Sequence, residues 1–292
     1  MPAMQWVLLA IVAFFAIRIV RMLARRHQKR TFREYGYVVE QHDLGRYGTM
    51  EFARWLHPRV KPETFSEAEV DGLREYVSEG DFVIDIGAHM GDTTVPLAYA
   101  AGKTGTTLAI EPNRYVYKIL EANAGLNKDK TNIVPGCYAV TDTDGRYTFL
   151  YSDASFCNGG NLGSIADQSH RHEFPLEVEG RRLETILRRD FADKLDRLSY
   201  VKIDAEGYDK DIIASISGIL REYKPVLVTE VLKKLNDDER DQMYDIIRGC
   251  GYELFQHTRS RPLKGEPIDR DTMKTLRHFD ILALPEGHDS TR

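Results

Sequence analysis

The sequence predicts a doubly wound α/β domain with a mainly parallel sheet, preceded by a hydrophobic helix at the N-terminus. Five short runs of apolar, β-forming residues follow residue 80: FVIDIG, TTLAIEP, TNIVPGCYAV, YVKIDAEG and PVLVTEV. Helix-forming segments such as DTTVPLAYAA, NRYVYKILEANAG and DKDIIASISGILREY separate most of them. Strands that are apolar throughout and alternate with helices indicate a parallel sheet covered on both faces. Such a sheet binds its ligands at the carboxyl ends of its strands.

The first 30 residues differ in composition from the rest. Residues 1–17 contain no charged side chain, whereas residues 18–30 carry six Lys or Arg and no acid. If Arg18 and Arg21 extend toward the headgroups, the apolar stretch reaches 20 residues, enough to span a bilayer. We therefore expect residues 1–30 to be a membrane anchor helix with a basic flank, and the large domain to face the cytoplasm. A helix lying in the membrane plane and a soluble helix remain alternatives.

The remainder of the chain is acidic. The whole chain has a net charge of −5, so residues 31–292 carry −11 once the six cations of the basic flank are set aside. A nucleic-acid partner is therefore not expected, because phosphate contacts need a basic face. The three cysteines, Cys137, Cys157 and Cys250, form no CxxC pair, so neither a disulfide framework nor a zinc site is predicted. A reducing compartment is the simplest interpretation.

Three regions follow the anchor. Residues 31–79 are expected to form a connector and a leading helix, with Ser66 as its N-cap and Glu69 three residues on. Residues 80–292 form the α/β domain, which ends in one more helix and two antiparallel strands, from DDERDQMYDIIRGCGYELF and HFDILALP. Residues 142–198 interrupt it: TDTDGRYTFLYSD alternates like an edge hairpin, a Gly- and Asn-rich loop follows, and PLEVEGRRLETIL begins a strand and a helix. This insertion is either a substrate-facing lid or a surface loop without a role.

A glycine-containing turn, DIGAHMGD, follows the first strand and opens a helix. Gly87 and Gly91 allow a sharp turn and the close approach of a ligand. The turn lacks the middle glycine of the dinucleotide fingerprint, because position 89 is His, and it has no Lys-Ser/Thr pair of a P-loop. Asp85 before the turn discourages a phosphate and favours a cationic ligand. Glu111 ends the second strand, where an acid is well placed to bind ribose hydroxyls.

Five stretches together, VIDIGAHMGD, LAIEPN, NIVPGCYAV, RLETIL and YVKIDAEGYD, resemble the FkbM family of class I S-adenosylmethionine-dependent methyltransferases, whose fold is Rossmann-like. The resemblance covers about residues 80–232 and implies S-adenosylmethionine as the cofactor. It implies that the turn at 85–91 wraps the methionine part, that Glu111 takes the ribose, and that the region of Tyr138 and Ala139 borders the adenine. The cofactor-binding residues expected on this basis are Asp85, Gly87, Ala88, His89, Gly91, Glu111, Asn113, Tyr138, Ala139 and Asp204.

The segment YVKIDAEGYD places three carboxylates at the end of a buried strand. Asp204 should emerge into the cleft where methyl group and acceptor meet, and partial desolvation would suit it to remove a proton. Glu206 and His89 are the other catalytic candidates, although His89 stands where relatives mostly have Asn and a structural role remains open. The alternative for Asp204 and Glu206 is capping of the next helix, and Asp209 is expected on that helix, in water.

The predicted function is methyl transfer to a hydroxyl of a membrane-associated glycan, lipid or secondary metabolite. No resident metal is expected, but a variant with Asp204 and Glu230 holding Mg²⁺ remains open. His170 and His172 lie in a polar loop and are expected to be solvated. Two other classes remain alternatives: an oxidoreductase with a nucleotide cofactor, and a non-catalytic membrane scaffold that retains the fold.

Overall fold

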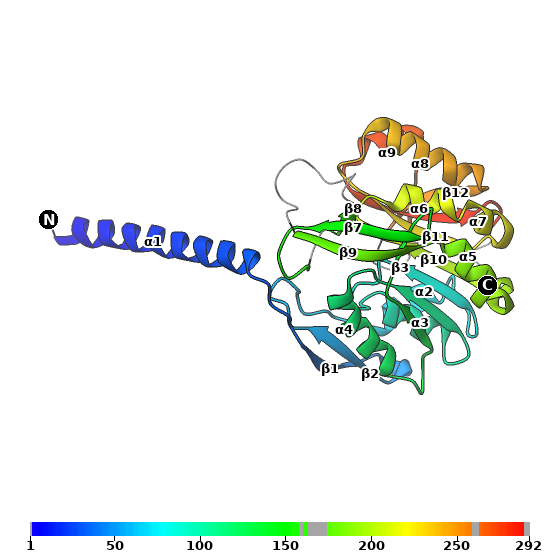
Figure 1. Cartoon of the computed structure of the whole chain (residues 1–292), viewed down its shortest axis with the longest axis horizontal. Helices are drawn as coiled ribbons and strands as arrows, with labels where there is room; N and C mark the ends of the chain where they lie inside the picture. Colours follow the sequence, from blue (N-terminus) through cyan, green and yellow to red (C-terminus); the bar gives the residue numbers. More distant parts are fainter. Residues whose placement is uncertain (1, 158–159, 163–173, 259–262, 289–292) are drawn as a thin grey trace.

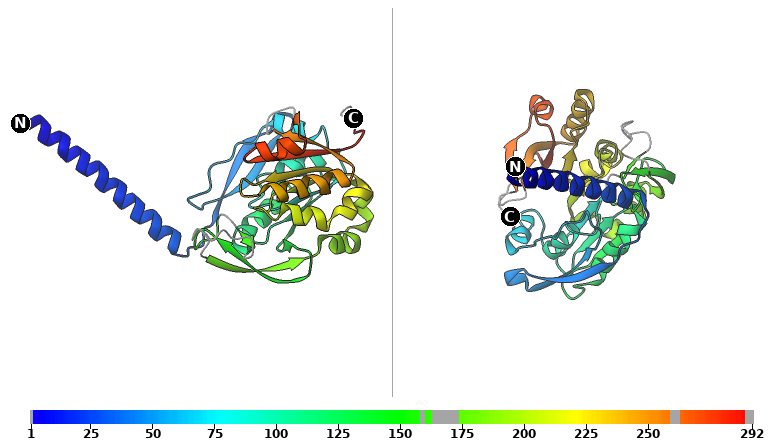
Figure 2. Two further views of the ribbon diagram at one scale, coloured as in Figure 1. Left: turned by 90° about the horizontal axis from the view of Figure 1, so that it is seen from above. Right: turned by 90° about the vertical axis from the view of Figure 1, so that its left-hand side faces the viewer.

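The computed structural model describes residues 2–157, 160–162, 174–258 and 263–288. The predicted solvated pair, His170 and His172, lies outside this range. The chain begins with a long helix, α1 (Pro2–Arg30), that projects away from the globular part (Figures 1 and 2). The predicted N-terminal helix is therefore present. Among the described residues, however, no helix combines the length and apolarity needed to cross a membrane, so the predicted span is not supported.

The central sheet is mixed, with eight strands among the described residues. In spatial order these are β13 (Lys264–Pro267), β12 (Tyr252–His257), β14 (Phe279–Pro285), β11 (Val226–Val231), β10 (Leu198–Ile203), β3 (Phe82–Ile86), β4 (Thr106–Ile110) and β5 (Ile133–Gly136). The five strands from β11 to β5 are parallel, as predicted. The predicted closing pair is also present, since β12 and β14 are antiparallel, and β14 lies between β11 and β12.

Helices cover both faces of this sheet, as the continuous hydrophobicity of its strands requires. Alternate residues of β3 belong to different cores: Ile84 packs on one side and Val83 on the other. The first face is covered by α5 (Leu183–Asp190), α6 (Asp209–Ser215), α7 (Ser217–Tyr223), α8 (Asp237–Gly249) and α9 (Arg270–Thr275). The second is covered by α2 (Glu67–Leu73), α3 (Thr94–Ala101) and α4 (Arg114–Gly125).

The connector contains more structure than predicted. Strands β1 (Tyr37–Asp43) and β2 (Thr49–Trp55), joined through the short helix η1 (Gly45–Tyr47), form an antiparallel hairpin. The hairpin packs on α4, where the buried Asn123 side chain bonds both the N–H and the carbonyl of Ala53, at 2.7 and 2.9 Å. The leading helix α2 is confirmed with its cap, because the Ser66 hydroxyl accepts the Glu69 N–H.

The insertion builds a second sheet. Its strands, in the order β6 (Ala139–Val140), β9 (Phe174–Arg181), β7 (Gly145–Tyr151) and β8 (Asn161–Leu162), form a small sheet separate from the central one. Of the edge hairpin expected around β7, the antiparallel pairing with the next strand, β8, is present, but β7 is not at an edge because the distant β9 pairs with its other side. The strand and helix expected in PLEVEGRRLETIL are β9 and α5, and the short helix η2 (Ala192–Arg197) leads into β10.

Candidate functional site

A cavity of about 430 Å³ opens at the carboxyl ends of β3, β4 and β10. The connector, the small sheet and the β10 turn supply its other walls. The predicted site residues that line it are Gly87, His89, Glu111, Asn113, Ala139, Asp204 and Glu206. Four others, Asp85, Ala88, Gly91 and Tyr138, are not among its lining residues. The predicted residues therefore belong to one site, although these four do not line its cavity.

The turn after β3 is fixed to its two neighbouring strands. The N–H groups of Gly87 and Ala88 both donate to the Ile110 carbonyl at the end of β4, at 2.9 and 3.0 Å. Gly87 has φ +78°, and a Cβ there would lie 1.9 Å from the main-chain oxygen of Asp204. Glycine is thus required at position 87 by the neighbouring backbone, before any ligand is considered.

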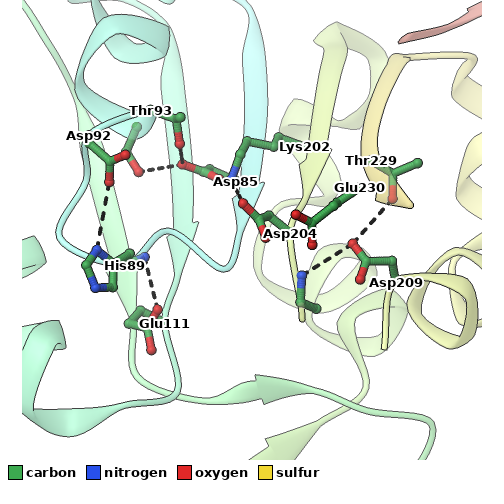
Figure 3. A network of polar contacts seen from close by, with 12 residues as sticks. Asp85, His89, Asp92, Thr93, Glu111, Lys202, Asp204, Asp209, Thr229 and Glu230 are labelled. Atoms are coloured by element: carbon green, nitrogen blue, oxygen red, sulfur yellow. Dashed lines mark hydrogen bonds and ion pairs between the residues drawn. The ribbon is translucent and has the colours of Figure 1, made fainter. Parts of the chain in front are cut away.

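Glu111 is a buried acid at the edge of the cavity. One of its oxygens accepts the N–H of His89 at 3.0 Å (Figure 3). The other accepts the N–H of Asn113 at 2.7 Å. Burial raises the pKa of Glu111 to about 7, and the two hydrogen bonds oppose this rise. Glu111 therefore joins the β3 turn to the start of α4 and leaves its remaining lone pairs for hydroxyl groups.

Asp85 lies fully buried behind the turn. One of its oxygens accepts the hydroxyls of Thr93 and Thr94, and the other lies 3.2 Å from Nζ of Lys202. Burial disfavours the charge of Lys202, but Asp85, Asp204 and Asp92 outweigh it and raise its pKa above the ordinary value. The positive charge of Lys202 thus compensates the negative charge of Asp85. Asp85 therefore attracts a cationic ligand less strongly than the sequence suggested.

Asp204 emerges from β10 into the cavity, as predicted. Its N–H donates to the Ile86 carbonyl at 3.0 Å, so its main chain is tied to β3. Its carboxylate lies 3.7 Å from Lys202 Nζ, and its side chain is 45% exposed. The desolvation expected for Asp204 is therefore limited, and Lys202 is its one ion-pair partner among the described residues.

Asp209 binds main-chain N–H groups before helix α6, the capping role that the sequence analysis left open for Asp204 and Glu206. Its carboxylate accepts the N–H groups of Ala205 at 3.3 Å and Gly207 at 3.0 Å, and the Thr229 hydroxyl lies 3.4 Å away. The expectation that Asp209 is in water is wrong, since it is 1% exposed. Burial, and then the charge of Asp204, raise its pKa to about 7.

Glu206 and Glu230 complete a group of carboxylates around Asp204. Glu206 is exposed, and its side chain has no hydrogen-bond or ion-pair partner in the described part of the chain. Glu230 lies 3.3 Å from His278, yet burial and its acidic neighbours raise its pKa to about 8. Within residues 2–157, 160–162, 174–258 and 263–288, no group of three such side chains could hold a metal ion, so the Mg²⁺ variant gains no support.

The model of the methyltransferase FkbM domain matches residues 85–254, more than half of the chain. The chain belongs to the FkbM methyltransferase family. This confirms the resemblance carried by the sequence motifs, and it gives no support to the oxidoreductase alternative. A search of curated proteins gave no significant match.

Solved structures of other methyltransferases are similar at low identity. An FkbM methyltransferase from Methylobacillus flagellatus is 14% identical over 71% of this chain, with a TM-score of 0.41, and this chain spans only 44% of it. TYW2 from M. jannaschii, solved in complex with AdoMet, is 15% identical, with 87% of this chain and 86% of that one covered and a TM-score of 0.41. An O-methyltransferase from Bacillus cereus, in complex with SAH, is 13% identical, with 75% and 79% covered and a TM-score of 0.40.

His89 of this FkbM domain has a left-handed backbone, with φ 48°. Asn, Asp and His adopt this conformation more readily than most residues, so His fits the backbone at this position. Its ring borders the cavity, lies 6.0 Å from the Trp55 ring, and has Nδ1 4.0 Å from Asp92. Partial loss of hydration lowers the pKa of His89, because it disfavours the charged ring. The negative charges of Asp92 and Asp204 oppose this shift.

The insertion and the connector meet at the cavity wall. Buried Asp153, just after β7, binds Arg59 at 2.9 Å and lies 3.7 Å from His57. The Asn113 side chain donates to the Phe156 carbonyl at 2.5 Å, which joins this wall to the start of α4. Part of the insertion therefore faces the site, in agreement with the substrate-facing interpretation.

Lys202 and Arg59 are the main site residues that sequence reasoning missed. Lys202 did carry a signal, because a lysine inside a strand buried on both faces must meet an anion. Arg59 carried none, since its position depends on Asp153, 94 residues further along the chain.

Proposed function

We propose that this FkbM domain binds S-adenosylmethionine in the cavity and catalyses methyl transfer to a hydroxyl oxygen of an acceptor. The observation that carries the proposal is the position of Asp204, an accessible carboxylate beside the β3 turn at the end of a parallel strand. S-adenosylmethionine supplies a methyl group on a positively charged sulfur. A carboxylate at this position favours that charge and can accept the proton of a hydroxyl.

The residues of the cavity fit this cofactor. Glu111 offers acceptor lone pairs to ribose hydroxyls, because each of its oxygens uses only one backbone N–H. Asp92 and Asp204 make the far side of the β3 turn acidic, which suits a cationic ligand. Ala139 and Val116 supply apolar surface for an adenine ring.

Three groups of the chain then have distinct tasks. Asp204 holds the proton removed from the hydroxyl. Lys202, whose Nζ lies 3.7 Å from the Asp204 carboxylate, holds that side chain in place. The rigid turn around Gly87 orients the reacting groups, and such alignment supplies much of the rate of a direct displacement.

We further propose that the acceptor is a membrane-associated glycan, lipid or secondary metabolite. The end of α1 and the residues just after it, here called the root of α1, support this because they bind the segment between two cavity-lining residues, Tyr151 and Cys157. The Lys29 carbonyl accepts the Ala154 N–H at 2.7 Å, and the Arg33 N–H donates to the Ser155 hydroxyl at 3.0 Å. The Phe32 ring packs on Phe156 with ring centres 6.2 Å apart. Whatever α1 binds is thereby held close to the site.

Exposed apolar side chains along α1 and the basic run at its C-terminal end suit a membrane surface. Among the α1 side chains that the structure describes, the large exposed apolar ones are Trp6, Ile11, Val12, Phe14, Phe15, Ile17, Ile19, Val20, Met22 and Leu23. The basic flank next to the globular part suits the anionic cytoplasmic leaflet, so we propose that the domain lies on the cytoplasmic side.

The test of function is incubation of the protein with a radiolabelled methyl donor and a membrane extract, followed by separation into lipid, glycan and protein fractions. We expect label in the lipid or glycan fraction. Label confined to protein would overturn the acceptor class, and cofactor binding without turnover on any extract would favour the scaffold alternative.

The membrane proposal has its own test, in which residues 1–28 are removed and Lys29 is kept because its carbonyl accepts the Ala154 N–H. The shortened protein should leave the membrane pellet and still bind S-adenosylmethionine. Its persistence in the pellet would require another membrane contact. In the full chain, exchanging the basic run for acidic residues should alter protease accessibility, and unchanged accessibility would count against the orientation.

A further inference from the structure

A second hollow, of about 820 Å³, lies away from the catalytic cavity and is lined by five arginines. These come from α4, β7, β9 and both ends of α5: Arg114, Arg146, Arg181, Arg182 and Arg189. We refer to this hollow as the arginine groove. Figure 1 shows the four elements that carry these arginines. Arg114 and Arg146 are distant in the sequence from the other three, so the fold brings the five together. This contrasts with the net acidity of the chain.

Three of the five guanidinium groups already have partners. Arg181 binds Glu179 at 2.9 Å, and Arg189 binds both oxygens of Asp190 at 2.7 Å. Arg114 donates at 3.5 Å to the Glu177 carbonyl, on the edge of β9 that β6 does not cover.

The side chains of Arg146 and Arg182 are exposed and have no hydrogen-bond or ion-pair partner within the described residues. Two guanidinium groups are thus available in one concave site.

The carboxylates that line the groove do not neutralise these two cations. Glu179 is held by Arg181, Glu177 binds the Thr148 hydroxyl, and Asp144 accepts the main-chain N–H of Arg182 at 2.8 Å. Each acid therefore has a partner other than the two unpaired guanidinium groups. An incoming anion could bind those groups without displacing any of these contacts.

We propose that the arginine groove binds a phosphate group, with Arg146 and Arg182 as its principal donors. A phosphomonoester carries a charge of about −1.5 to −2 at neutral pH, which matches two unpaired guanidinium groups. Guanidinium forms paired, charge-assisted hydrogen bonds with phosphate oxygens, and arginine is preferred wherever such recognition is needed. The Thr185 hydroxyl, which also lines the groove, is a further donor.

Two sources can supply the phosphate: the headgroup of an anionic lipid or a free phosphate compound. The small sheet connects the groove to the root of α1, because β7 begins at the groove and the chain just after its end holds Lys29. A lipid source would therefore give the domain a second contact with the surface that α1 is proposed to bind. The phosphate site itself does not depend on the proposed methyl transfer.

The first experiment measures binding of inorganic phosphate to the full chain by calorimetry, with chloride of equal ionic strength as the reference. Wild-type protein should bind phosphate, and the double variant Arg146→Gln/Arg182→Gln should bind it at least about tenfold more weakly. The matched control is Arg221→Gln/Arg277→Gln, which removes two exposed arginines outside the groove. Absence of phosphate binding by the wild type, or equal binding by the two double variants, would overturn the site.

The second experiment distinguishes the sources by sedimentation with phosphatidylcholine vesicles, with and without phosphatidic acid. If the groove takes a lipid headgroup, the Arg146→Gln/Arg182→Gln variant should lose part of the phosphatidic-acid-dependent binding that the Arg221→Gln/Arg277→Gln control keeps. Loss of inorganic phosphate binding with unchanged vesicle binding would support the site with a free phosphate compound as its ligand. Retained binding of S-adenosylmethionine by both variants would show that the catalytic cavity is intact.

Discussion

Gly87 and Asp204 lie in backbone contact across the two central strands of the sheet. A Cβ added to Gly87 would lie 1.9 Å from the Asp204 carbonyl oxygen, and the Asp204 N–H bonds the carbonyl of Ile86, next to Gly87. The turn proposed to hold the cofactor and the turn that presents the carboxylate therefore form one rigid unit. The geometry of the site depends on a residue without a side chain.

Gly87→Ala should destabilise the fold, because the new methyl group meets backbone that cannot move aside and φ is +78°. We expect a loss of at least about 2 kcal/mol in the free energy of unfolding, measured by urea denaturation. Gly125→Ala is the control, since nothing lies within 4 Å of a Cβ at this last residue of α4. Equal stability of the two variants would contradict the contact between positions 87 and 204. Loss of cofactor binding in a Gly87 variant is therefore meaningful only when its fold is shown to be intact.

Lys202→Met should destabilise the protein by about 3 kcal/mol or more, because it leaves the fully buried Asp85 without its cation. Asp85→Asn in the same chain removes the uncompensated charge and keeps an oxygen for the threonine hydroxyls. The double variant should therefore be more stable than Lys202→Met alone. The measurement is a double-mutant cycle by urea unfolding at pH 7, and strictly additive losses would show that the two side chains do not interact.

Much of the central sheet could be predicted from the sequence, because its signals are local. The runs around Ile84, Leu108 and Val201 are mostly apolar and do not alternate with polar residues, and burial of both strand faces follows from that pattern. The cap of α2 was equally readable, since Ser66 and the N–H of Glu69 are three residues apart.

The parts that were not predicted depend on pairing between distant segments. Nothing in the β7 sequence specifies β9 as its partner across the intervening loop. Asp209 looks like an ordinary exposed acid at a helix start, and its burial depends on Thr229 and the β10 turn folding over it. The same holds for Arg59, whose place in the cavity wall depends on Asp153.

Glu230→Gln should stabilise the protein in alkaline solution and have little effect in acid. Folding raises the pKa of Glu230 from 4.5 to about 8, so the native state binds a proton that the unfolded chain releases above its lower pKa. Its contribution to stability is fully present below about pH 4.5 and is lost as the pH rises through about 8.

Glutamine mimics the protonated acid, so at pH 8.5 the variant should gain at least about 1.4 kcal/mol, the equivalent of one pKa unit. Urea unfolding at pH 4.5, 6.5 and 8.5 tests this, with exposed Glu253→Gln as the control. A difference between variant and wild type that is the same at every pH would exclude the raised pKa.

Asp204→Asn should fold normally and lose most of its methyl transfer. The main-chain bonds of residue 204 are unaffected, and its exposed carboxylate has Lys202 as its one ion-pair partner among the described residues. Removal of a general base costs about 10²–10⁴ in rate, so turnover should fall at least about a hundredfold. If Asp204 acts mainly as the base, affinity for S-adenosylmethionine in calorimetry should change little; if it also attracts the sulfonium, affinity should fall too. Glu206→Gln should have the smaller effect, because that side chain is exposed and unpaired within the described residues. Wild-type turnover in Asp204→Asn would remove Asp204 from the chemistry and leave the carboxylates of this turn with a structural role alone.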